Sequence, residues 1–211
     1  ERGAVMAADG YSRINMRQKF GVVAVQSQAG AENAMGGIAQ AAADNIPILI
    51  LLGGNSLDQI SVKPNFNAVQ KYQGWVKQVE AIYSPAQVGA VMRRAFNALK
   101  NGPPGPVVVE MTTDVCQQDV PKEYQNYKSP SSSLQVPDNN EITTAIELWQ
   151  KARKPVIWAG GGVLASSGSI PLKELAELTA TPVFCTMPGK SSFDERHPLA
   201  LGAGCGTTTE M

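Results

Sequence analysis

Short apolar segments of strand length alternate with stretches of helical periodicity along most of this chain. An uninterrupted apolar run is typical of a strand that is buried on both faces, and helices that connect such strands produce a parallel sheet. The expected strands are residues 21–27, 48–52, 75–79, 107–111, 155–159 and 182–185. The expected helices are residues 4–11, 31–43, 84–101, 142–149 and 171–178. The sequence therefore predicts an α/β protein with helices on both faces of its sheet.

The alternation is interrupted once, between Thr112 and Pro137, where Gln, Ser, Pro and Tyr replace the hydrophobic period. This composition is typical of a boundary between domains. We expect a first domain over residues 1–113, a linker over 114–138 and a second α/β domain over 139–211. The chain begins without Met and stops within a Gly/Thr run at residues 204–209, so we expect a fragment of a longer protein, incomplete at both ends.

Charge and cysteine content exclude several classes of function. Eighteen basic and eighteen acidic residues cancel without any block of like charge, which argues against a nucleic-acid partner. The longest apolar run, residues 46–52, is much shorter than a membrane span. Cys116, Cys185 and Cys205 are odd in number and form no C-x-x-C pair, which argues against disulfides and zinc. A reducing, cytoplasmic setting fits best.

Two segments of the first domain carry candidate functional residues. Glu1 opens the run ERGAVMAADGYSR, and a buried Val-rich strand then leads to the turn Ser27-Gln28-Ala29-Gly30 and on to Glu32-Asn33. Taken alone, Glu1 is an acid at a helix N-terminus, where the helix dipole favours it without any functional role. The turn, taken alone, is an ordinary connection between a strand and a helix.

Taken together, these segments closely resemble the pyrimidine-binding half of a thiamine diphosphate enzyme of the acetolactate synthase group. The resemblance implies that the first domain is a parallel-sheet pyrimidine-binding domain and that the second is a truncated, Rossmann-like central domain. Glu1 would be a buried catalytic carboxylate that hydrogen-bonds a ring nitrogen of the cofactor's aminopyrimidine and favours its imino tautomer, which removes the thiazolium C2 proton. The turn and Asn33 would line the pyrimidine edge, giving the cofactor-binding residues Ser27, Gln28, Ala29, Gly30 and Asn33.

The resemblance extends to other parts of the chain. The strand Gly105–Glu110 is similar to the one that closes the pyrimidine domain, and residues 186–202 are similar to a central-domain stretch. In acetolactate synthases that domain holds FAD, whereas in many relatives it holds another nucleotide or nothing, so the ligand of this domain stays open. The intact protein would decarboxylate or ligate a 2-oxo acid, would bind Mg2+ through a third domain that this chain lacks, and would be a homodimer or homotetramer. The fragment alone would be inactive.

The chain departs from the family pattern at two places. The usual turn is Ser-Gly-Pro-Gly, so Gln28 and Ala29 differ from it, and Asn65-Phe66-Asn67 stands where many acetolactate synthases have Phe-Gln-Glu. Substrate contacts in the family come in part from that loop, so the identity of the 2-oxo acid stays open.

Two other readings stay open beside the resemblance. Gly160-Gly161-Gly162 follows an expected strand and could hold a nucleotide phosphate, as in a nucleotide-dependent oxidoreductase. The next strand, residues 182–186, offers no acid for a ribose, which weakens this reading. The single histidine, His197, lies in a loop beside Pro198 and far from any nucleophile elbow. The second alternative is a non-enzymatic α/β binding module in which Glu1 has no role.

Overall fold

The computed structural model describes residues 1–60, 62–124, 127–133 and 135–204. Contacts between Cα atoms divide the chain into two compact units, Glu1–Ser133 and Leu134–Met211, which we call unit 1 and unit 2. Both contain a parallel sheet with helices packed on it, so the predicted α/β class is confirmed. Cys205 and most of the terminal Gly/Thr run lie outside the described residues.

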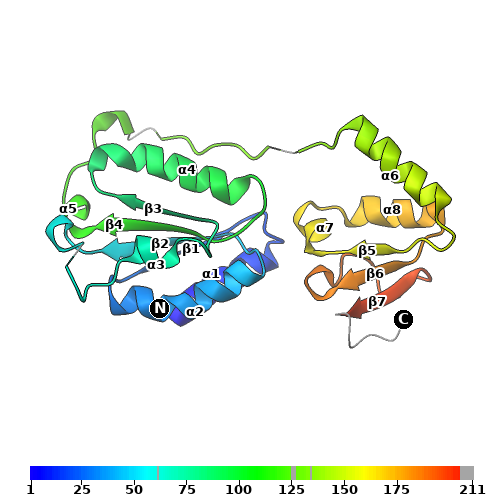
Figure 1. The fold of residues 1–211 in the computed structure, drawn as a ribbon, viewed down its shortest axis with the longest axis horizontal. Coiled ribbons are helices and arrows are strands. Elements are labelled where there is room, and N and C mark those ends of the chain that lie inside the picture. Colours follow the sequence, from blue (N-terminus) through cyan, green and yellow to red (C-terminus); the bar gives the residue numbers. More distant parts are fainter. Residues whose placement is uncertain (61, 125–126, 134, 205–211) are drawn as a thin grey trace. The chain divides into compact units, whose positions relative to one another are not determined.

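Unit 1 is built on a sheet of four parallel strands in the order β1-β2-β4-β3. Its strands are β1 (Gly21–Val25), β2 (Ile48–Gly54), β3 (Gln78–Ile82) and β4 (Val107–Thr112). Its helices are α1 (Arg2–Ile14), α2 (Ala29–Ala43), α3 (Ala68–Tyr72), α4 (Val88–Lys100) and α5 (Thr113–Cys116), with short 3-10 turns η1 (Leu57–Gln59), η2 (Pro85–Gln87) and η3 (Lys122–Tyr124). Helices α1 and α2 lie on one side of the sheet and α4 on the other (Figure 1).

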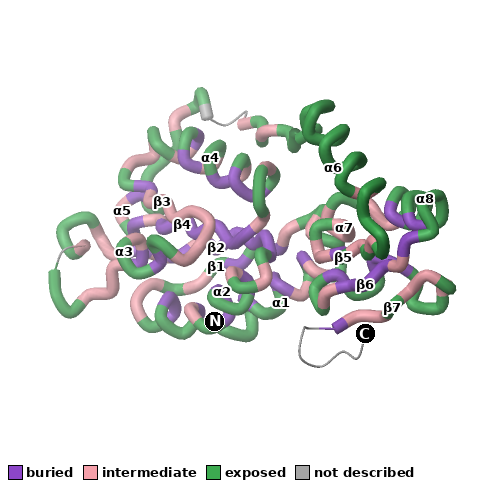
Figure 2. The backbone as a smooth tube through the Cα atoms, turned by 45° about the vertical axis from the view of Figure 1, so that its right-hand side comes forward, coloured by how far each residue is buried: buried purple, intermediate pink, exposed green. Residues whose placement is uncertain are grey.

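The uninterrupted apolar strands are explained by burial on both faces of this sheet. Ile50 is paired between Val23 and Val108, and all three belong to the core beneath α1 and α2. The alternate residues Leu49 and Val107 belong to the core beneath α4. Figure 2 shows the buried positions concentrated in the strands and on the inner sides of the helices. Successive side chains of a strand point to opposite faces, so a strand covered on both sides is apolar at most of its positions.

The α1–β1 connection packs unusually closely. A Cβ atom at Gly21 would run into the carbonyl group of Ala8, so only glycine fits at the start of β1. The Ser12 hydroxyl, fully buried, donates to the carbonyl oxygen of Pro47 at 2.7 Å and accepts from the Gly21 amide at 2.8 Å. One side chain therefore joins α1 to the beginnings of β1 and β2.

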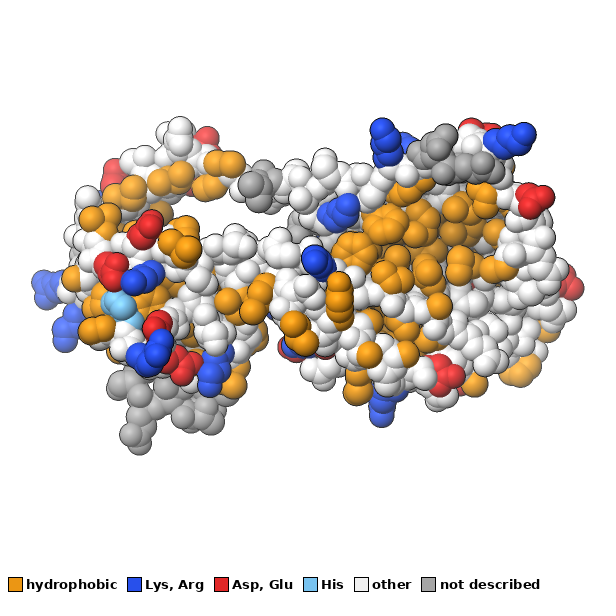
Figure 3. Space-filling model, turned by 180° about the vertical axis from the view of Figure 1, so that it is seen from behind, with side chains coloured by type: hydrophobic (Ala, Val, Ile, Leu, Met, Phe, Trp, Pro, Cys, Tyr) orange, Lys and Arg blue, Asp and Glu red, His pale blue; other side chains and the backbone are white. Residues whose placement is uncertain are grey.

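The sheet of unit 1 is incompletely covered near β1, which is an edge strand. Val22 is 56% exposed, and Phe20, Leu51 and Met92 on the α4 side are only partly buried. Figure 3 shows hydrophobic side chains gathered over a broad area of this unit, seen from behind. An edge strand with an exposed apolar face is a site at which further chain can be added.

Two expectations for unit 1 need correction. The segment 55–74, to which the sequence analysis assigns neither helix nor strand, contains α3, because the Asn67 side chain caps it by accepting from the Gln70 amide and because Tyr72 is fully buried. The third strand begins at Gln78 and not at residue 75. Trp75 packs its ring on Tyr72 and donates from its indole to the Lys71 carbonyl oxygen, so it belongs to the α3 side of the core.

The stretch expected to be a linker contains structure at its beginning and packs on α4 further along. Helix α5 begins at Thr113, the ring of Tyr127 stacks on Phe96, and Asn101 Oδ1 accepts from the Ser133 amide at 2.6 Å. Polar side chains at the end of α4 thus hold a segment that has no hydrophobic period of its own.

Unit 2 has three parallel strands in the order β5-β6-β7. Its elements are α6 (Asn139–Lys151), β5 (Ile157–Ala159), α7 (Gly161–Ala165), α8 (Ser169–Thr179), β6 (Val183–Thr186), η4 (Met187–Gly189) and β7 (Ala200–Gly204). The core lies between α8 and the sheet and includes Leu172, Ala176, Val183 and Phe193. No residue of α6 is buried among those described. The tight turn expected at Gly160–Gly162 is instead the beginning of α7.

Candidate cofactor-binding site

The predicted turn lies at the carboxyl ends of the strands of unit 1, the edge at which open parallel sheets bind ligands. Ser27 follows β1, and α2 begins at Ala29. A Cβ atom at Gly53, near the end of β2, would lie 3.1 Å from the Ser27 nitrogen. Glycine at position 53 therefore allows the neighbouring strand to approach the backbone of the turn.

Glu1 lies against this turn. A Cβ atom at Gly30 would lie 3.5 Å from Glu1 Cγ and 3.7 Å from Glu1 Oε1, and 2.8 Å from Cβ of Gln26. The absence of a side chain at Gly30 therefore keeps the space beside the carboxylate open. Glu1 precedes α1 as its N-cap residue, and its side chain makes no capping hydrogen bond.

Glu1 and Asn33 line one polar depression on the surface of unit 1. Its volume is about 480 Å³, and its walls are Glu1, Arg2, Gly3, Glu32, Asn33 and Gly36. Of its two glycines, Gly3 has open space where a Cβ atom would lie, whereas the space beside Gly36 is taken by the Arg2 guanidinium. The structure thus brings Glu1 together with Gly30 and Asn33, which lie about thirty positions further along the sequence.

The expectation of a buried Glu1 needs correction, because this residue is exposed in the described structure. Gly3, beside it in the depression, provides no side chain to cover it. Burial of its carboxylate would need a surface from outside the described residues, such as a bound ring or another part of the protein.

Gln28 has a different orientation from the one expected. Its backbone has φ 56° and ψ −118°, and its side chain points to the segment after β2. Nε2 donates to Asn55 Oδ1 at 2.7 Å, and Oε1 accepts from the Phe66 amide at 3.0 Å. The Gln28 amide is therefore engaged in the protein and does not line the depression beside Glu1.

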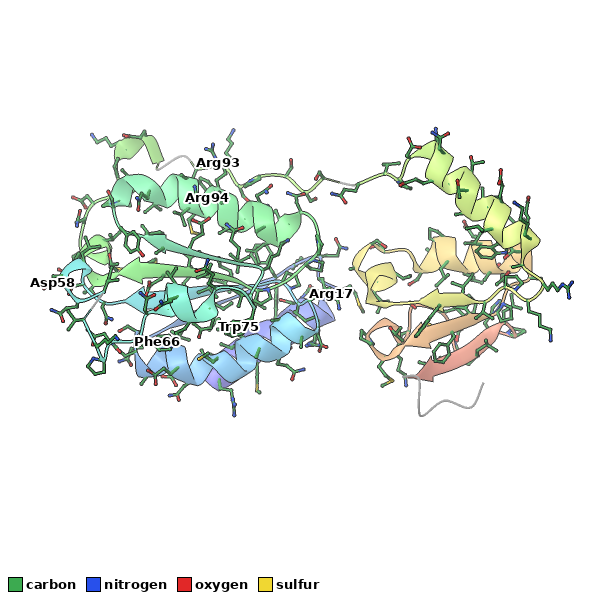
Figure 4. The ribbon with its side chains drawn as sticks, in the orientation of Figure 1. Arg17, Asp58, Phe66, Trp75, Arg93 and Arg94 are labelled. Carbon is green, nitrogen blue, oxygen red and sulfur yellow. The ribbon has the colours of Figure 1, made fainter. Side chains whose placement is uncertain are left out.

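The segment between β2 and α3 is held at its start by residues that follow β4. Asp114 accepts from the Leu57 amide at 2.6 Å, and the Thr113 hydroxyl donates to the Gly54 carbonyl oxygen at 2.9 Å. Further along, Phe66 packs edge-on against Tyr72, with ring centroids 6.4 Å apart. Phe66 and Asp58, both on this segment, are labelled in Figure 4.

Sequence analysis missed one buried acid at the same edge of the sheet. Glu110, in the last part of β4, is 7% exposed, and burial raises the pKa of its carboxyl group above the ordinary value. A Cβ atom at Gly54 would lie 2.9 Å from Glu110 Cγ, so glycine makes room for this side chain. The available signal in the sequence was an acid placed directly after a run of three valines.

The predicted glycines of unit 2 lie where β5 passes into α7. Gly160 is the N-cap of α7, and a Cβ atom at Gly189 would lie 2.7 Å from its carbonyl carbon. The strand β6 ends in Thr186, whose hydroxyl accepts from the Gly189 amide at 3.2 Å. Gly160, Gly161 and Gly162 thus belong to unit 2, whereas the other predicted cofactor-binding residues belong to unit 1.

His197 is engaged within unit 2. Its Nδ1 accepts from the Leu199 amide at 3.2 Å, and its Nε2 lies 3.1 Å from Glu177 Oε1. Because Nδ1 is an acceptor here, the proton of the neutral ring is on Nε2 and points to Glu177. This arrangement supports a structural histidine.

Two family matches cover most of the chain. Residues 1–81 match the thiamine pyrophosphate enzyme N-terminal TPP binding domain, and residues 142–210 match the thiamine pyrophosphate enzyme central domain. The chain belongs to the thiamine pyrophosphate enzyme family. The resemblance derived from Glu1, the turn and the central-domain stretch is therefore confirmed at the level of the family.

Relatives of this thiamine pyrophosphate enzyme chain include acetolactate synthases. It is 34% identical over 216 residues to a probable acetolactate synthase large subunit of Methanococcus aeolicus, with 96% of this chain and 35% of that protein covered. It is 32% identical over 214 residues to acetolactate synthase isozyme 3 large subunit of Escherichia coli, with 96% and 36% covered. The chain thus spans about a third of the length of these relatives.

The described part of the chain offers neither a membrane-spanning helix nor a metal cluster. In residues 1–60, 62–124, 127–133 and 135–204, no helix combines the length and the apolar character needed to cross a bilayer. The same described residues contain no group of three or more His, Cys, Asp or Glu side chains placed to hold a metal ion.

Proposed function

We propose that unit 1 binds the aminopyrimidine ring of thiamine diphosphate in an enzyme that decarboxylates or ligates a 2-oxo acid, as an acetolactate synthase does. The observation that carries the proposal is the placement of Glu1 against Gly30, in one depression with Asn33, within a chain of the thiamine pyrophosphate enzyme family. When bound, thiamine diphosphate supplies a carbon nucleophile for attack on a 2-oxo acid.

The residues of the depression fit a flat ring with a polar edge. The Glu1 carboxylate holds a proton shared with a ring nitrogen, which is general acid–base catalysis by a positioned side chain. Asn33 offers both a donor and an acceptor to the ring edge. Ser27, Ala29 and Gly30 contribute backbone and small side chains, which permit close approach of the ring.

The remaining parts of the enzyme are predictions that follow from this assignment. Mg2+ and the diphosphate are held by residues outside this chain, and the intact protein is a homodimer or homotetramer that buries Glu1 against another part of the assembly. Binding of FAD by unit 2 and a cytoplasmic location stay predictions. Visible absorbance of the purified protein tests for the flavin, and sedimentation velocity tests the oligomeric state.

The test is Glu1→Gln in the full-length polypeptide that contains these residues. We expect pyruvate consumption in the presence of thiamine diphosphate and Mg2+ to fall by about a hundredfold or more, because an amide cannot exchange the proton. Glu141→Gln is the matched control, since Glu141 is an exposed acid in the first turn of another helix, α6. Calorimetry reports whether the cofactor still binds.

Three results would separate the alternatives. Loss of turnover with retained cofactor binding supports the catalytic role of Glu1. Cofactor binding by the unaltered protein without turnover of pyruvate, but with turnover of another 2-oxo acid, supports the family function with a different substrate. Unchanged turnover in Glu1→Gln, or no cofactor binding by the unaltered protein, contradicts the proposal and favours a binding module.

A further inference from the structure

The Gln28 backbone has a conformation that glycine adopts easily and other residues avoid. Its φ of 56° with ψ of −118° lies outside the regions open to residues with a Cβ atom. Such strain persists only where the surroundings maintain it, and it is found preferentially at functional sites. The position is the first residue ahead of α2, within the turn that passes beside Glu1.

The hydrogen bonds of the Gln28 side chain explain why position 28 holds a residue other than glycine. Its amide is engaged at both ends, donating to the Asn55 side chain and accepting from the Phe66 backbone. Asn55 and Phe66 lie near the two ends of the segment between β2 and α3, whose described residues 55–60 and 62–67 we call the β2–α3 segment. One side chain thus closes this segment and joins it to the turn after β1.

The reach of the side chain matters for this bridge. Glycine at position 28 would relieve the backbone strain but would have no atoms with which to reach the β2–α3 segment. Methionine would retain the strain and the approximate length but would neither donate nor accept as an amide does. Methionine therefore removes the bridge alone, whereas glycine removes both the bridge and the strain.

We propose that Gln28 is a positioning residue that holds the β2–α3 segment at a fixed distance from the turn assigned to the cofactor ring. The inference rests on the proposed function, because the turn is the one assigned there to thiamine diphosphate. The segment and the turn then form two walls of one site, and their separation determines how well a 2-oxo acid fits between segment and cofactor. Loss of the bridge affects substrate affinity more than cofactor affinity.

The first experiment measures amide hydrogen exchange in the full-length protein without cofactor or substrate. Gln28→Met and Gln28→Gly are compared with the unaltered protein and with Gln40→Met, a control on the exposed side of α2. We expect peptides that cover residues 55–67 to exchange about tenfold faster in both position-28 variants, since two hydrogen bonds are lost. Faster exchange should be confined to this segment and the adjoining turn.

The partner residue provides a rescue test. Asn55→Asp keeps an acceptor for Gln28 Nε2 and should retain slow exchange, whereas Asn55→Leu should resemble Gln28→Met. Thermal unfolding supplies an independent readout: Gln28→Gly should melt above Gln28→Met, because both lack the bridge but only glycine relaxes the backbone. Equal exchange in Gln28→Met and the unaltered protein would overturn the inference.

Steady-state kinetics connects the bridge to the site. With pyruvate, or with whichever 2-oxo acid the unaltered protein consumes, Gln28→Met should raise KM several-fold with a smaller change in kcat and in cofactor affinity. A fall in kcat with unchanged KM would overturn the positioning role. If the unaltered protein binds no thiamine diphosphate while the exchange results hold, the proposed function fails and the structural bridge stands.

Discussion

The hydroxyl of Tyr72 donates a hydrogen bond of 2.6 Å to the carbonyl oxygen of Ala31, which joins α3 to the first turn of α2. Tyr72 is fully buried, and burial raises the pKa of its hydroxyl to about 12, so it remains a donor at neutral pH. The short helix in the middle of a polar segment is thereby tied to the helix that carries Asn33.

Replacing Tyr72 with Phe tests this connection. The change removes one buried hydrogen bond and keeps the ring, so the free energy of unfolding should fall by about 1 kcal/mol. Tyr11→Phe is the control, because Tyr11 is 50% exposed on α1. Urea unfolding of both variants measures the difference, and equal stability of the two would show that the Ala31 contact contributes nothing.

Loss of the Ser12 hydroxyl should lower the free energy of unfolding more than the small size of this group suggests. In Ser12→Ala, the Gly21 amide and the Pro47 carbonyl oxygen both lose their side-chain partner in a buried place. We expect the free energy of unfolding to fall by about 2 kcal/mol. Thr143→Ala, which removes a hydroxyl from the exposed α6, should change stability by less than about 0.5 kcal/mol.

Two glycines of unit 1 should respond in opposite directions to alanine. Gly21→Ala places a methyl group into the Ala8 backbone, which cannot move aside easily, so we expect a loss of about 1–3 kcal/mol. Gly10→Ala adds a methyl group where nothing lies within 4 Å, in the interior of α1, and should increase stability by about 0.5–1 kcal/mol. Thermal unfolding of the two variants and of the unaltered protein measures these changes in stability.

Glu110 should give unit 1 a pH dependence of known sign. Burial raises the pKa of its carboxyl group, so the folded protein binds this proton more tightly than the unfolded chain does. As pH rises from the unfolded pKa through the folded pKa, the folded state therefore loses stability relative to the unfolded state. Glu110→Gln removes the titrating group and should lessen this decline.

The measurement is denaturant unfolding of both proteins from acid to neutral pH. The difference in unfolding free energy between variant and unaltered protein should shift in favour of Glu110→Gln as pH increases. A difference that stays constant over that range would mean that Glu110 titrates alike in both states.

The apolar runs made the strands of unit 1 predictable, because β2 and β4 are buried on both faces and β1 buries alternate residues. The position of β3 was not predictable in the same way. In the sequence, Trp75 extends the apolar pattern ahead of this strand, but in the structure its ring packs on Tyr72. That packing depends on tertiary contacts. The short helix α3 was likewise hidden, since Asn67 as a cap and Tyr72 as an anchor leave too few residues for a visible helical period.

The candidate site was predictable in its residue types but not in its side-chain directions. Glu1 and Asn33 meet in one depression because α1 and α2 lie side by side, which follows from the parallel topology. Nothing in the local sequence indicates that Gln28 points away to Asn55, because its partners lie beyond the next strand. The burial of Glu110 depends in the same way on Gly54 of the neighbouring strand.

The bridge between Gln28 and Asn55 also has an evolutionary consequence. A lineage that exchanged Gln28 for glycine would relax the backbone at once and leave the Asn55 amide without this partner. The residue at position 55 would then be free to change, whereas a lineage that keeps glutamine at position 28 would retain an oxygen acceptor at position 55. Residue types at positions 28 and 55 are therefore expected to vary together among descendants of a common ancestor.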